Sequence, residues 1–93
     1  MANTKSAAKR VRVAERRRQR NRIFISSART RIRKAEKLIT QGDAEAAATA
    51  VGNAISTLDR AAVKGIIHKN NAARRKSRLM AKFNRLVRSQ TPG

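Results

Sequence analysis

The sequence lacks several residue types, and each absence excludes a class of site. There is no cysteine, tryptophan or tyrosine, and the only aromatic residues are Phe24 and Phe83. Without cysteine there is no disulfide framework and no thiolate metal site, which fits a reducing compartment. With so few aromatic rings, stacking platforms for single-stranded bases are also missing. The single proline, Pro92, lies next to the C-terminus, so nothing before it forbids long helices.

Side chains suited to catalysis are equally scarce. The chain has five acidic residues and one histidine, and its glycines are isolated, so no glycine-rich phosphate loop exists. Asp43 and Glu45 are better explained as residues at a helix start. We interpret His68 as a polar contact at another helix start, open to RNA, rather than as a general base. We therefore expect no enzyme activity, no cofactor and no metal site.

Membrane signals are missing as well. No apolar run approaches the roughly 18–20 residues of a membrane span. Residues 1–5 do not resemble a secretory signal, and residues 7–22 lack the Leu, Phe or Trp face of an interfacial helix. We expect an intracellular, cytoplasmic protein without a membrane partner.

Positive charge is the dominant feature that is present. The 93 residues contain 24 Lys and Arg against 5 Asp and Glu, a net charge of +19. Residues 1–37 hold 14 basic and 2 acidic residues, residues 38–63 hold 1 and 3, and residues 64–93 hold 9 and none. Because like charges repel in a compact state, such a chain needs a polyanion or must spread its charge widely. Nucleic acid is the first candidate for the polyanion and an anionic membrane surface is the second.

The apolar pattern predicts an all-α protein, a three-helix bundle packed up-down-up. A first helix should begin near Thr4 or Ser6 and end near Thr40, before Gly42. A second should be capped by Asp43 and end at Gly65, and a third should be capped by Asn70 or Asn71 and fray near Ser89. The buried stripes would contain Phe24, Ala28, Ile32, Ala35 and Ile39, then Ala47, Val51, Ala54, Leu58 and Ala61, and finally Ala72, Leu79, Phe83 and Leu86.

Helix lengths predict an overhang. A first helix of about 35 residues spans roughly 50 Å, and a second of about 21 residues spans roughly 31 Å. With an antiparallel turn at Gly42, Lys64 lies opposite about Arg20, so the N-terminal half of the first helix projects from the bundle. We divide the single domain, 1–93, into a projecting basic arm (1–22), a bundle (23–88) and a flexible tail (89–93).

The arginine run within the arm has its own pattern. At 100° per residue, its members point all around a helix, which suits a slot between several phosphate backbones. A disordered basic tail is the alternative. The core of the bundle is thin, so we expect marginal stability without a partner. Composition alone leaves ribosomal, nucleoid and histone-like proteins open.

Specific residues distinguish among these classes of protein. The chain resembles the bacterial small-subunit ribosomal protein S20 family in its opening (residues 2–7), in Arg20-Asn21-Arg22, and above all in Lys64-Gly65-Ile66-Ile67-His68-Lys69-Asn70 followed by residues 72–79. The resemblance implies a three-helix bundle that binds small-subunit ribosomal RNA directly, early in assembly. It also implies contacts with the 5′ domain and with the long helix near the 3′ end, few protein contacts, and a monomer within the ribosome.

The sequence therefore predicts a structural constituent of the small subunit that binds 16S-type RNA and helps to fold it. The alternative is a DNA-compacting architectural protein, although no exposed apolar wedge is evident in the sequence. The predicted RNA-binding residues are Lys5, Lys9, Arg10, Arg12, Arg16, Arg17, Arg18, Arg20, Arg22, Arg29, Lys64, His68, Lys69, Asn70, Arg74, Arg75, Lys76 and Arg78.

Overall fold

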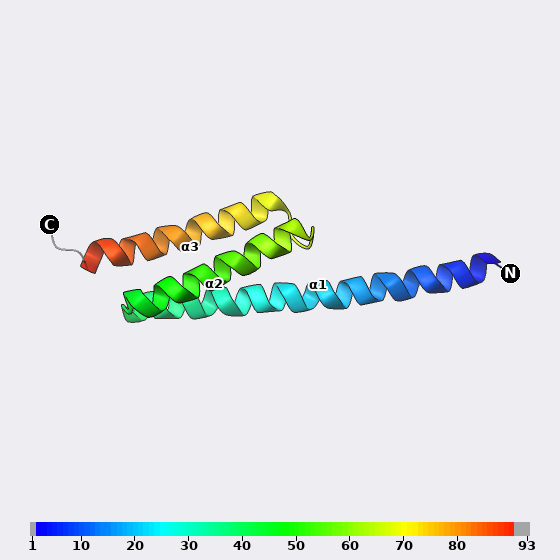
Figure 1. Ribbon diagram of the computed structural model, residues 1–93, viewed down its shortest axis with the longest axis horizontal. Helices are drawn as coiled ribbons and strands as arrows, with labels where there is room; N and C mark the ends of the chain where they lie inside the picture. The colour runs from blue at the N-terminus through cyan, green and yellow to red at the C-terminus, as the bar shows by residue number, and fades with distance from the viewer. Residues whose placement is uncertain (1, 91–93) are drawn as a thin grey trace.

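The computed structural model describes the backbone of residues 2–90 and the side chains of residues 6–90. It contains three helices, α1 (Ala2–Gln41), α2 (Ala44–Val63) and α3 (Lys69–Gln90), and residues 2–90 contain no strand. The chain runs along α1, turns back along α2 and turns again into α3 (Figure 1). The predicted all-α, up-down-up bundle with a long first helix is confirmed, although α1 begins at Ala2, before the predicted caps.

The first turn joins α1 to α2 through a left-handed glycine. Gly42 has φ +80°, and its N–H donates to the Ile39 carbonyl at 3.1 Å while the Asp43 N–H donates to the Leu38 carbonyl at 3.2 Å. This pair of bonds is the Schellman arrangement, which satisfies the last carbonyls of a helix. Asp43 then caps α2, because its Oδ1 accepts from the Ala46 N–H at 3.1 Å. Both predicted roles are confirmed.

The second turn, which joins α2 to α3, has the same hydrogen-bonding arrangement. Gly65 has φ +74°, and the Gly65 and Ile66 N–H groups donate to the Ala62 and Ala61 carbonyls at 3.0 and 2.9 Å. The predicted cap of α3 is wrong, because neither Asn70 nor Asn71 precedes the first helical residue. The cap is His68, whose Nδ1 accepts from the Asn70 N–H at 3.1 Å. An acceptor is needed at this place, and the imidazole supplies it.

The core is built mostly from alanine. Seven of its ten buried apolar residues are alanines, and the large ones are Val51, Leu58 and Leu79. Small side chains allow the helix backbones to approach closely, but they bury little apolar area, so the predicted thin core is confirmed. Phe83, predicted as a core residue, is only partly buried and packs against the cluster from its edge.

Polar contacts fix α3 against the other two helices. The Lys82 ammonium lies 3.0 Å from the Glu36 carboxylate of α1, and the Lys76 ammonium lies 2.7 Å from Asp59 of α2. At the far end, the Gln90 side-chain amide donates to the Gly42 carbonyl. The end of α3 therefore lies beside the first turn, and its basic start lies at the opposite end of the bundle.

The N-terminal half of α1 has no neighbouring helix (Figure 1). Every side chain from Ser6 to Arg20 is exposed. The radius of gyration is 18.4 Å, against about 12 Å for a compact chain of this length. The molecule measures 74 × 21 × 13 Å, and the long dimension follows α1. We call residues 6–20 the arm.

Candidate nucleic-acid interface

The arm presents its cations to solvent on every side. The predicted binding residues between Lys9 and Arg20 are all exposed, whereas the side chain of Lys5 lies outside those that the structure describes. Arg18 is 3.4 Å from Glu15 in an exposed i,i+3 pair, a type of contact that contributes little. The structure describes the arm as a helix rather than as a disordered tail, and its place in a slot between phosphate backbones stays a prediction.

At the base of the arm, the α2–α3 turn meets α1. The Lys64 ammonium lies over the Phe24 ring, 5.1 Å from its centroid. The helix lengths predicted that Lys64 would lie opposite about Arg20, which is one helical turn from Phe24 along α1. The difference arises because side chains lean toward the N-terminus of their own helix, so on antiparallel helices the lysine and the ring lean toward each other. His68 at the end of this turn, and Lys69 and Asn70 at the start of α3, are exposed.

Two predicted residues, Arg29 of α1 and Arg75 of α3, line the same small cavity. Arg29 and Arg75 both line a space of about 140 Å³ whose other walls include Ile25, Leu58 and Ile67. The Arg75 Nε donates to the Asn71 Oδ1 at 2.8 Å, which orients its guanidinium. Arg29 and Arg75 are both exposed and cationic, so each guanidinium is available to a phosphate group on this side of the bundle.

The remaining predicted binding residues of α3 differ in whether their side chains are already paired within the protein. Arg74 and Arg78 are exposed, and neither has a hydrogen bond or ion pair among residues 6–90. Lys76 is half-buried and paired with Asp59 at 2.7 Å. That ammonium therefore helps to hold α3 on α2, and it keeps fewer donors for a phosphate than its neighbours do.

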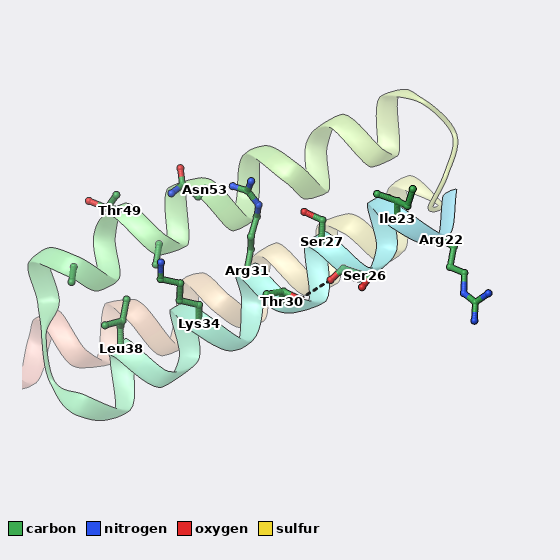
Figure 2. A pocket seen from close by; sticks show the side chains of 12 residues that line it. Arg22, Ile23, Ser26, Ser27, Thr30, Arg31, Lys34, Leu38, Thr49 and Asn53 are labelled. Atoms are coloured by element: carbon green, nitrogen blue, oxygen red, sulfur yellow. Dashed lines mark hydrogen bonds between the residues drawn. The ribbon is translucent and has the colours of Figure 1, made fainter. Parts of the chain in front are cut away.

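The sequence analysis missed a second basic surface, an open groove between α1 and α2. Arg31 and Lys34 extend from α1 toward α2, where Thr49 and Asn53 lie on the facing wall (Figure 2). Ser27 lies between the two walls. Helical spacing places residues 27, 31 and 34 on one face of α1, which is a signal in the sequence. The residues of the opposite wall come from α2. Which of them face this part of α1 depends on how the two helices pack, and the sequence contains no signal for that.

Several large apolar side chains are exposed, and this corrects an argument made from the sequence. Val11, Ile23 and Val63 are 67%, 70% and 89% exposed. Because apolar wedges are a device of DNA-bending proteins, their supposed absence cannot be used to exclude that class.

Residues 6–90 contain no group of three or more His, Cys, Asp and Glu side chains able to hold a metal ion. None of α1, α2 and α3 combines the length and the apolar character needed to cross a membrane.

Comparison with known proteins identifies the family. Residues 2–84 match the family model described as Ribosomal protein S20. A protein of Thermomicrobium roseum, named small ribosomal subunit protein bS20, is 67% identical over 90 residues, which cover 97% of this chain and 91% of the relative. A protein of the same name from a Roseiflexus species is 60% identical over 83 residues, covering 89% and 90%. The chain therefore belongs to the ribosomal protein S20 family.

Proposed function

We propose that this protein is a structural constituent of the small ribosomal subunit, in the cytoplasm, that binds 16S-type ribosomal RNA directly and helps to fold it during assembly. Membership of a ribosomal protein family makes it a structural protein and not an enzyme. The observation that supports direct RNA binding is the arm, whose side chains are exposed on all sides and whose cations, apart from Arg18, have no acidic partner among residues 6–90.

The arm would act by replacing counterions on several RNA strands at once. Each phosphate that a Lys or Arg neutralises releases condensed cations, and this release supplies much of the affinity. A helix with cations on every side gains most where backbones surround it. The bundle anchors the arm through the Lys64–Phe24 contact at its base. The cations beside the second turn, including Lys69 and Arg74, extend the same surface.

The resemblance to the family suggests which RNA lies on these surfaces, namely the 5′ domain and the long helix near the 3′ end. The projecting arm and the basic bundle end beside its base form one long contact surface, so one monomer could hold two RNA segments together. Few protein contacts are needed for this role. The predicted division into arm (1–22), bundle (23–88) and tail (89–93) is retained here as part of the proposal.

Co-sedimentation with small ribosomal subunits across a salt series tests the proposal. The full chain should co-sediment with the subunits at moderate salt and should dissociate as salt rises, because phosphate contacts supply much of its affinity. A chain lacking residues 1–20 should stay folded and should bind small-subunit RNA far more weakly. If the full chain does not co-sediment with the subunits at moderate salt and binds duplex DNA as tightly as ribosomal RNA, the DNA-compacting alternative is the better description.

A further inference from the structure

The groove between α1 and α2 combines residues in a way that the net charge of the protein alone does not explain. It is lined by 12 residues, and none of them is acidic, although α2 contains two acidic residues, Glu45 and Asp59. The side chains of Arg31 and Lys34 form no ion pair or hydrogen bond with any residue from 6 to 90. Two cations therefore point into one hollow without a counter-charge inside the protein.

The groove also holds neutral polar groups that are not used internally. Thr30 bonds back to the Ser26 carbonyl at 3.0 Å, as threonines in helices often do. By contrast, the side chains of Ser27, Thr49 and Asn53 make no hydrogen bond to any part of the chain that the structure describes. Small or apolar side chains, Ala46, Ala50 and Leu38, line the groove as well.

This combination matches the chemistry of a ribose–phosphate strand. Cations bind phosphate, hydroxyl and amide groups can exchange hydrogen bonds with a ribose 2′-hydroxyl, and apolar lining residues accept the sugar face. The 2′-hydroxyl, both donor and acceptor, lets a protein distinguish RNA from DNA, and A-form helices display it in their wide minor groove. Arg31 and Lys34 are three residues apart, about 4.5 Å along the axis, so they present adjacent contacts to one strand.

We propose that the α1–α2 groove seats one strand of an RNA duplex, with Arg31 and Lys34 on its phosphates and with Thr49 and Asn53 on its 2′-hydroxyls. On this view the arm supplies affinity for any polyanion, whereas the groove supplies the preference for RNA. The inference rests on the proposed function, because it assigns part of the RNA contact to a surface outside the arm.

The test compares the full chain on three probes of one sequence at fixed salt: an RNA duplex, a DNA duplex, and a 2′-O-methyl RNA duplex. The methylated duplex retains phosphates but loses the hydroxyl donor. The wild-type chain should prefer RNA to both others. Thr49→Val with Asn53→Leu should weaken RNA binding about five- to tenfold, as expected for two lost hydrogen bonds, and should leave DNA binding within about twofold. Ser56→Ala, an exposed change elsewhere on α2, is the matched control.

A second pair of variants separates the groove from the arm. Arg31→Gln with Lys34→Gln and Arg16→Gln with Arg17→Gln remove the same charge. The arm pair should weaken binding to all three probes by similar factors, whereas the groove pair should reduce the ratio of RNA to DNA affinity. Circular dichroism of each variant shows that the helices persist.

Two results would overturn the groove assignment while leaving the proposed function intact. One is a wild-type chain that co-sediments with small subunits but binds the RNA, DNA and methylated duplexes equally. The other is a Thr49→Val, Asn53→Leu chain with the wild-type preference for RNA. If the wild-type chain binds neither small subunits nor any RNA probe, the proposed function and the inference both fail.

Discussion

The Lys64 ammonium lies 5.1 Å from the centroid of the Phe24 ring, and this contact ties the second turn to the base of the arm. A cation over an aromatic face contributes about 0.5–1 kcal/mol at an exposed site. We expect a double-mutant cycle of Phe24→Leu and Lys64→Met, followed by urea unfolding, to give a coupling energy in that range. A coupling of zero within error would mean that the two side chains are merely adjacent.

The glycines give a matched series of substitutions. Gly42 and Gly65 adopt φ +80° and +74°, so Gly→Ala at either position should lower stability by about 1–2 kcal/mol. Gly52 lies inside α2, and a Cβ there would meet nothing within 4 Å. Gly52→Ala should therefore raise stability by about 0.5–1 kcal/mol. Denaturant unfolding of the three variants measures these changes in stability. If all three changes had the same sign, the assignment of Gly42 and Gly65 to left-handed turns would be contradicted.

Leu58 and Leu79 are the largest fully buried side chains, 1% and 2% exposed. Truncation of either to alanine should lower stability by about 2–5 kcal/mol, enough to unfold a marginal bundle in the absence of RNA. Phe83→Ala should cost less than a fully buried phenylalanine would, because the ring is only partly buried. Val63→Ala, at a position 89% exposed, is the control and should change stability by at most about 0.5 kcal/mol. Melting curves by circular dichroism measure all four, and unchanged melting of both leucine variants would contradict the core assignment.

The arm should open and close in the free protein although α1 is helical along its length. Residues 6–20 pack on no other helix, an isolated helix of this size is marginal in water, and neighbouring arginines repel. We expect fast amide exchange from Arg10 to Arg18 in the free chain and slow exchange once small-subunit RNA is bound. The ordering cost is met at the moment of binding. Strong protection of these amides without RNA would show a preformed rigid helix.

Salt should weaken RNA binding steeply. If about 8 cationic side chains engage phosphates, log K should fall with log salt at a slope of roughly −6 to −7. Arg16→Gln should weaken binding modestly and flatten that slope by roughly 1. Filter binding across a salt series measures both quantities. A wild-type slope shallower than about −2 would exclude binding dominated by phosphate contacts.

The sequence by itself determined the features that depend on near neighbours along the chain. Gly42, Asp43 and Gly65 set the helix ends, because a Schellman turn or a cap is completed within about six residues. Helix lengths likewise determined the overhang, because two antiparallel helices of unequal length must leave one end unpaired. The capping role of His68 is also local, but asparagine is the commoner cap and obscured it.

Only the tertiary structure decided how the helices meet. It set the Lys64–Phe24 register, through the lean of side chains on antiparallel helices, and it left Phe83 at the edge of the core. It also assembled the groove, whose walls hold Arg31 on one helix and Asn53 on the next. Helical periodicity gives the face of each residue on its own helix. Which two faces form a common surface depends on close packing between alanines that are distant in sequence, and no single segment contains that information.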